Sequence, residues 1–351
     1  MTKSDKNTVK KTPPPPPPPT KKAAELAPQA AIENNNSNEV IEGNIVAPLD
    51  LNFFFTEQPE KLDFIWQGGP LAGTVGALVA PGGAGKSFFA LEAAIAIAAK
   101  EIESADLLGL KPTEAGVVDY YVFEDPVPVL HHRLHAISAY LSLEARQLVQ
   151  KNLRLRPMIG NTGFNFALNM TLSEQIIEAS KGSRLIVFDT LSRTHSYDEN
   201  KNGEMAVLLK QLEYIAIKTG AAVLFLHHTS KGSASEGRGG EQQAARGASA
   251  LIDNARWCGF VQTMTEKESE TFFTSHETEP IGKEARRFYL KHGVSKQNYS
   301  MPLEDVWLER REGGVLKPVD LVHVSTQQQR ENLKGRSRKL TKKELSNDEN
   351  W

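Results

Sequence analysis

Short apolar runs alternate with longer helical patterns over most of the chain, from about residue 50 to residue 320. The runs predict strands at 74–80, 116–123, 185–188 and 221–226, and the longer patterns predict helices at 88–99, 126–140, 142–151 and 204–218. Strands that alternate with helices indicate a largely parallel sheet covered on both faces. After Ala255 we expect shorter strands, at 256–263, 287–292 and 305–310, which predict hairpins at the edge of the sheet. The expected fold class is therefore α/β, with short antiparallel strands at its C-terminal edge.

The two ends of the chain differ from this central part. Residues 13–19 are an unbroken proline run, and the first 22 residues carry a net charge of +5. The last 22 residues carry +3, whereas residues 23–329 between them carry −10. Polar segments of this kind bury too little apolar surface to offset the entropy of ordering. We therefore expect a disordered arm over 1–48, one domain over 49–320 and a basic disordered tail over 321–351.

Composition excludes several classes of protein. No apolar run reaches the roughly 18–20 residues that a membrane span needs, and the Lys-rich start of the chain has no apolar segment typical of a secretory signal. Cys258 is the single cysteine among the 351 residues, which excludes an internal disulfide framework and a cysteine-cluster metal site. We expect a cytoplasmic protein without a membrane partner.

The strongest motif lies between the first predicted strand and the helix after it. It comprises Pro81, Gly82, Gly83, Ala84, Gly85, Lys86, Ser87 and Phe88, and Ala80 stands where the usual pattern has its first glycine. Glycines let backbone N–H groups curl around phosphate oxygens, and the helix N-terminus favours negative charge. Lys86 would reach the β- and γ-phosphates, and the Ser87 hydroxyl would ligate Mg²⁺. The motif predicts a P-loop that binds ATP with Mg²⁺.

Carboxylates follow two other predicted strands. The apolar strand at 185–188 ends in Asp189, which has the form of a Walker B acid that holds Mg²⁺. Glu124 and Asp125 follow the second strand, and parallel strands place their carboxyl ends on the same side as the P-loop. Glu124 is the expected catalytic carboxylate that polarises the attacking water. Asp125 is expected to cap the helix that starts at Pro126.

Two histidines, His227 and His228, end the strand at 221–226, and one of them is expected to contact the γ-phosphate, with His227 favoured. The next segment, 229–246, is rich in Gly and Ser, which indicates a mobile loop. Lys231 and Arg238 in this loop are the expected DNA-binding residues, although a plain solvated loop is the alternative.

Several segments besides the P-loop together resemble the RepA-type replicative helicases of IncQ-like plasmids. They are 72–79 leading into 81–87, 124–126, 131–136, 226–228, 253–257 and 293–296. The resemblance covers roughly residues 50–320. It implies a RecA-like fold and a ring-shaped homohexamer with ATP sites at subunit interfaces and single-stranded DNA in the channel. It also implies an origin-binding protein and a primase as partners.

The resemblance carries roles over to individual residues. Lys86 and Ser87 match the P-loop pair, Glu124 the catalytic carboxylate, Asp189 the Walker B acid, His227 the γ-phosphate sensor and Arg256 the arginine finger. Arg246 is the second candidate for the finger, Lys296 is a further candidate for a contact across subunits, and Arg133 is expected to be structural. We therefore expect an ATP-dependent DNA helicase. A RecA-like DNA-binding ATPase that does not unwind DNA, and a nucleotide-binding replication scaffold, remain the alternatives.

Overall fold

The structure is a computed structural model that describes residues 40–41, 45–46, 48–228 and 249–324, except 276, 278 and 302. The chain divides into two compact units, residues 1–61 and 62–351. The first unit holds the antiparallel pair β1 (Val40–Ile41) and β2 (Ile45–Val46), and the short helix α3 (Leu51–Thr56). The Asp50 side chain caps α3 by accepting a hydrogen bond from the Asn52 N–H at 3.0 Å.

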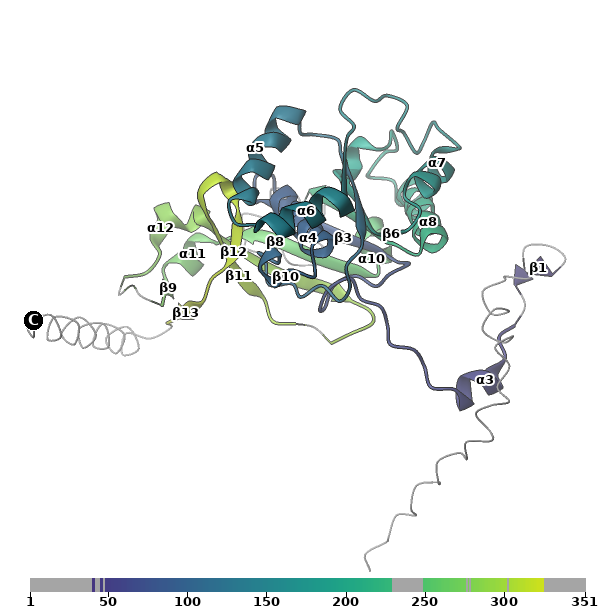
Figure 1. Ribbon diagram of the computed structural model, residues 1–351, viewed down its shortest axis with the longest axis horizontal. Helices are drawn as coiled ribbons and strands as arrows, with labels where there is room; N and C mark the ends of the chain where they lie inside the picture. Colours follow the sequence, from purple (N-terminus) through teal and green to yellow (C-terminus); the bar gives the residue numbers. More distant parts are fainter. Residues whose placement is uncertain are drawn as a thin grey trace, which may run out of the picture. The chain divides into compact units, whose positions relative to one another are not determined.

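A nine-stranded sheet forms the centre of the second unit (Figure 1), with the strand order β12-β11-β10-β8-β3-β7-β6-β4-β5. Its strands are β3 (Val75–Ala80), β4 (Val117–Val122), β5 (Leu153–Pro157), β6 (Ser183–Asp189), β7 (Ala222–His228), β8 (Trp257–Thr263), β10 (Tyr289–Gln297), β11 (Val306–Arg310) and β12 (Leu316–Pro318). The six strands from β8 to β5 pair in parallel, whereas β10, β11 and β12 are antiparallel. We call these last three strands the antiparallel edge. The expected fold class is confirmed.

Helices cover both faces of this sheet, because buried side chains alternate along each strand. On β7, Leu224 and Leu226 join the cluster beneath one group of helices, whereas Val223 and Phe225 join the cluster beneath another. The first group is α4 (Lys86–Ala98), α5 (Val127–Ser138) and α6 (Leu143–Asn152), and the second is α7 (Leu172–Ala179), α8 (Asn202–Thr219) and α10 (Ser249–Asn254). Alternation therefore decides which face each residue at the end of a strand serves.

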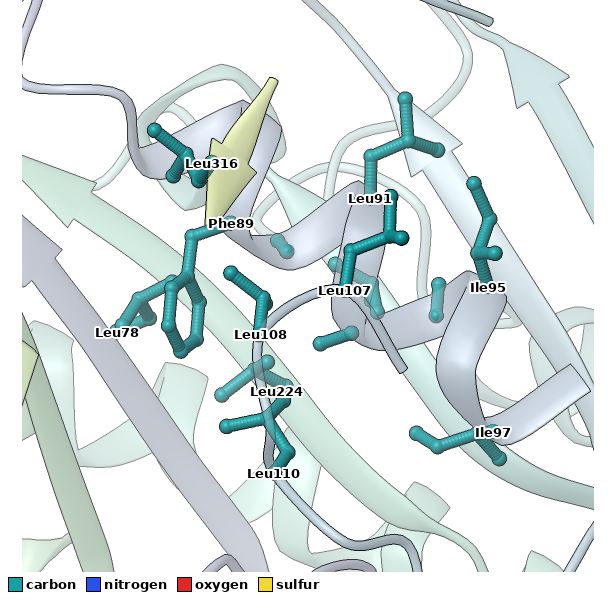
Figure 2. Close-up of a cluster of buried hydrophobic side chains, with 14 of the residues drawn as sticks. Leu78, Phe89, Leu91, Ile95, Ile97, Leu107, Leu108, Leu110, Leu224 and Leu316 are labelled. Carbon is teal, nitrogen blue, oxygen red and sulfur yellow. The ribbon is translucent and has the colours of Figure 1, made fainter. Parts of the chain in front are cut away.

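Helix α4 is apolar on almost every side and runs through the larger cluster (Figure 2), so that Phe89, Ile95 and Ile97 are all fully buried. Leu316 of β12 packs in the same cluster. The only acid in α4, Glu92, is fully buried, and its Oε1 accepts a hydrogen bond from the Leu316 N–H at 2.9 Å. The antiparallel edge is thereby fastened to the helix that follows the P-loop.

The structure adds elements that the sequence pattern did not predict and corrects the domain ends. Strand β5 lies at the far edge of the sheet, where alternating arginines obscured its pattern. Further short elements are α11 (Glu266–Ser269), α12 (Gly282–Ala285) and the separate antiparallel pair of β9 (Phe272–Thr274) with β13 (Leu321–His323). Residues 321–323 were expected to begin the tail, but their pairing with β9 makes them part of the domain. The short pair β1–β2 likewise lies inside the arm expected to be disordered.

The rest of the expected arm and tail, including the proline run at 13–19, lies outside the described residues. None of the described helices is both long enough and apolar enough to cross a membrane.

Candidate active site

The P-loop joins the end of β3 to the start of α4, as the sequence predicted. Gly83 and Gly85 have φ angles of 76° and 96°, a region that side chains with a Cβ rarely adopt. At Gly85 the space is also restricted, because a Cβ there would lie 3.1 Å from the Cδ1 atom of Leu290. The loop therefore requires glycine at Gly85 for both its backbone conformation and its packing.

An open cavity of about 340 Å³ lies beside this loop. Its lining residues are Pro81, Gly83, Gly85, Lys86, Ser87, Phe88, Glu124, Asp125, Arg133, His228, Arg310 and Gly314. Six of the eight residues predicted to bind the nucleotide are among them. Of the other two, Gly82 is exposed outside the cavity lining, and Ala84 turns its side chain into the core.

The Lys86 side chain is almost completely buried at the base of the cavity. Burial lowers the pKa of Lys86, while the nearby charges of Asp189 and Glu124 act in the opposite direction. In the described part of the chain no carboxylate lies within ion-pair distance of its ammonium group. A buried cation without a paired anion is costly, so this arrangement favours an anionic ligand such as a phosphate.

Ser87 and Asp189 lie together at the inner end of the cavity, with the Ser87 hydroxyl donating to Asp189 Oδ1 at 3.2 Å. The buried Tyr120 hydroxyl donates to the other carboxylate oxygen at 2.9 Å. Burial raises the pKa of Asp189, whereas Lys86 and the two hydroxyl groups favour its ionised form. A hydroxyl next to a carboxylate is the donor set that holds Mg²⁺ beside a P-loop, so these residues fit the predicted metal. Tyr120 was not predicted, because its position in the sequence has only the pattern of a strand.

Glu124 stands at the exposed side of the same cavity, one residue beyond Phe123. Its Oε1 accepts a hydrogen bond from the Thr190 hydroxyl at 2.9 Å and lies 3.6 Å from the Arg193 Nε. Its Oε2 lies 3.9 Å from the Nε2 atom of His228. The carboxylate is therefore held at a fixed place near Lys86 and Ser87 and still faces the open cavity. Thr190 directly follows Asp189, but the sequence alone did not connect it with Glu124.

Asp125 does not cap α5, which corrects the sequence expectation. The cap of α5 is Pro126, and no side chain accepts a hydrogen bond there. Asp125 instead pairs with Arg133, whose Nη1 lies 2.5 Å from Asp125 Oδ2. The Arg133 guanidinium also lies over the Phe88 ring, 5.3 Å from its centroid. Arg133 thus has the structural contacts that were expected of it, and in addition it lines the cavity.

The two histidines at the end of β7 point to opposite faces of the sheet. His228 lines the cavity on the same face as α4, whereas His227 is buried on the face with Phe225. Burial, followed by the neighbouring charge of His228, lowers the pKa of His227 to about 4. The sequence favoured His227 as the residue that contacts the phosphate, but the placement of the side chains favours His228.

Arg256 and Lys296 lie at the opposite end of the sheet from the P-loop. The Arg256 N–H bonds to the Val75 carbonyl at the start of β3, about 17 Å along the strand from the P-loop end at Ala80. The Arg256 side chain is exposed, and the Lys296 ammonium donates to the carbonyls of Ile252 and Asp253 nearby. Neither residue can reach the cavity of its own chain. Lys231, Arg238 and Arg246 lie outside the described residues.

Two cavity residues, Arg310 and Gly314, come from the antiparallel edge and the turn after β11, and had no motif to mark them. They belong here because β11 runs antiparallel to β10, which brings its last residue to the same end of the sheet as the P-loop. Pairing between distant segments therefore completes a site that the P-loop begins.

Comparisons with known proteins place the chain in a family. A family model described as an AAA domain, AAA_25, matches residues 44–234, more than half of the chain. The chain is also similar to the solved ATPase domain of a helicase, with 14% identity and a TM-score of 0.49, covering 70% of this chain and 85% of that one. It is similar to the RadB recombinase as well, with 12% identity and a TM-score of 0.45, covering 72% of this chain and 93% of that one. The chain is a RecA-like P-loop ATPase and belongs to the AAA_25 family of AAA domains.

Proposed function

We propose that this protein is an ATP-dependent DNA helicase, a ring-forming motor that couples ATP hydrolysis to movement along single-stranded DNA in plasmid replication. The observation that carries the proposal is the convergence of Lys86, the Ser87–Asp189 pair and Glu124 on one open cavity. The resemblance of several other segments to RepA-type helicases supports the choice of a DNA motor among ATPases. Replication partners such as an origin-binding protein and a primase belong to the same proposal.

The chemistry of hydrolysis follows from these side chains. Lys86 holds the β- and γ-phosphates, and Ser87 with Asp189 would hold Mg²⁺, which neutralises charge on the phosphate oxygens when it is bound. Glu124 accepts the proton of the attacking water, and its hydrogen bond from Thr190 fixes the direction of the carboxylate. His228 is placed to hydrogen-bond the γ-phosphate and to respond when that group leaves.

A ring explains why a required arginine lies far from the cavity of its own chain. Transition-state charge on the γ-phosphate needs a cation, and an arginine supplied by a neighbouring subunit fulfils this role in many P-loop enzymes. Arg256 is exposed at the end of the sheet opposite the P-loop, so it is available to a neighbour. In the proposed hexamer each ATP site lies between two subunits. Arg246 remains the second candidate for the same role.

DNA contacts are assigned to the segment that follows His228. Lys231 and Arg238 come soon after a residue that faces the phosphates, so this segment would connect the nucleotide state with DNA. We expect the change of both residues to Ala to reduce DNA-stimulated ATPase and to leave basal ATPase unchanged. Contacts with phosphodiesters should also make DNA affinity fall steeply with salt. Unchanged stimulation in the double variant would remove these two residues from the proposal.

A strand-displacement assay with a tailed duplex tests the function. The proposal predicts that the full chain releases the labelled strand with ATP and that the Glu124→Gln variant does not. ATP turnover that DNA stimulates, without displacement, would instead indicate a RecA-like DNA-binding ATPase in recombination or regulation. DNA or partner binding without any turnover would indicate a nucleotide-binding replication scaffold.

A further inference from the structure

Two arginines line the nucleotide cavity in this chain, and they differ in how their charge is balanced. Arg133 forms an ion pair with Asp125. Arg310, at the end of β11, has no carboxylate within ion-pair distance in the described part of the chain. Its Nη2 instead donates a hydrogen bond to the Gly83 carbonyl of the P-loop, at 3.2 Å.

The packing around Arg310 holds its guanidinium against the P-loop. Arg310 Nη2 lies 3.2 Å from the place where a Cβ at Gly85 would stand, so the contact between the side chain and the loop is close. On the other side, Arg310 pairs with Leu316 of β12, and the Leu316 N–H is bonded to Glu92 of α4. The antiparallel edge therefore cannot move away from the P-loop without breaking these contacts.

This position is costly for a cation that has no anion beside it. The Arg310 side chain is half-buried, and burial lowers its pKa. It shares the cavity with the buried Lys86 ammonium and with a loop whose N–H groups also favour negative charge. Removing a charge from water is unfavourable unless another charge compensates it, so this end of the cavity requires an anion.

We propose that Arg310 is a ligand of the nucleotide's phosphate chain, supplied by the antiparallel edge of the same subunit. The inference rests on the nucleotide site of the proposed function and extends it, because β11 lies outside residues 44–234 that the family model matches. A planar guanidinium suits phosphate oxygens, since it can donate two parallel hydrogen bonds. The ligands are therefore nucleoside di- and triphosphates, bound through phosphate and not through the base.

The binding of ADP and of inorganic pyrophosphate to the full chain tests this role by calorimetry. Arg310→Gln keeps a donor for the Gly83 carbonyl but removes the charge, and we expect it to weaken both ligands by about tenfold. Arg310→Lys keeps the charge without the fork, so a smaller loss, about threefold, is expected. The matched control is Arg311→Gln, because Arg311 is adjacent, pairs with Glu309 at 2.7 Å and does not line the cavity.

Unchanged binding of ADP by Arg310→Gln would overturn the proposal, since the residue would then only support the loop. A loss for ADP without a loss for pyrophosphate would also overturn it, because the contact would then be with ribose or base. Hydrogen exchange of the wild-type chain gives a test that needs no variant. ADP should slow exchange in β11, and no change there would contradict the proposal. A chain that binds ADP through Arg310 but never unwinds DNA would refute only the helicase function.

Discussion

The two ends of the parallel strands carry different halves of the chemistry expected from the sequence. At the P-loop end, Lys86, Asp189 and Glu124 meet around one cavity. At the opposite end, Arg256 lies exposed beside Lys296, outside that cavity. Parallel strands place all their carboxyl ends together, so one chain gathers its catalytic acids but not its predicted arginine finger. We infer that a single chain has the means to bind ATP but needs a neighbour to complete hydrolysis.

Removal of the catalytic carboxylate should disable the P-loop end most severely. Glu124→Gln keeps the size of the side chain but cannot accept the proton of the attacking water. We expect kcat for ATP to fall by about 10²–10⁴-fold while nucleotide affinity stays within about twofold. Phosphate release and calorimetric binding of ADP measure the two quantities. Turnover that survives the change would show that another group activates the water.

Thr190 should come next in size, because it positions Glu124 and does not contact substrate. Thr190→Val removes the hydroxyl that donates to Glu124 at 2.9 Å and keeps the shape of the side chain. A hydrogen bond to a charged group is worth roughly 1.5–3 kcal/mol, so kcat should fall about 10–100-fold without a change in KM. Thr190→Ser should restore most of the rate. If Thr190→Ser were as slow as Thr190→Val, the hydroxyl would not be what matters.

His227 and His228 allow a finer test, because adjacent residues serve opposite faces of the sheet. His228→Ala should lower turnover about tenfold and leave the melting temperature unchanged, since this side chain lines the cavity. His227→Ala should lower the melting temperature by at least about 3 °C, since it leaves a void among buried side chains. Steady-state kinetics and thermal melts of the two variants decide between them. The reverse pattern would restore His227 as the residue that contacts the phosphate.

Glu92 should influence turnover least, because it lies behind the cavity and acts on stability. Burial raises its pKa from 4.5 to about 8, so folding takes up a proton between these values. The free energy of unfolding should therefore be highest from this group below pH 4.5 and should fall as pH rises towards 8, by about 1 kcal/mol per unit. Urea unfolding at several pH values measures this slope. Glu92→Gln should flatten it, and an unchanged slope would assign it to other groups.

Much of the P-loop end could be predicted from the sequence, because its residues follow strands at fixed spacings. Lys86 and Ser87 open a helix, and Asp189 ends an apolar strand, so a local pattern was enough to find them. Arg310 and Tyr120 could not be found in this way. They reach the site through strand pairing between distant segments, and no local pattern encodes that pairing.

The choice between His227 and His228 depended on a different property, the phase of alternation along β7. A shift of one residue exchanges the two faces of a strand, and a sequence pattern locates the end of a strand only to within a few residues. Burial of Phe225 on the α8 face defines the phase in the structure. The hydrogen bond between Asp189 and Tyr120 shows the same alternation on the neighbouring strands, because it joins side chains on the α4 face.

A subunit-mixing experiment asks whether the two ends belong to one site in neighbouring chains. Arg256→Ala and Lys86→Ala should each be almost inactive alone, because one lacks the finger and the other lacks the P-loop lysine. Mixed together, they should regain ATP turnover at interfaces that join an intact P-loop to an intact Arg256. A mixture of Lys86→Ala with Glu124→Gln, which are both defective at the P-loop end, should gain nothing. Full activity of Arg256→Ala alone, or no recovery in the first mixture, would contradict the account.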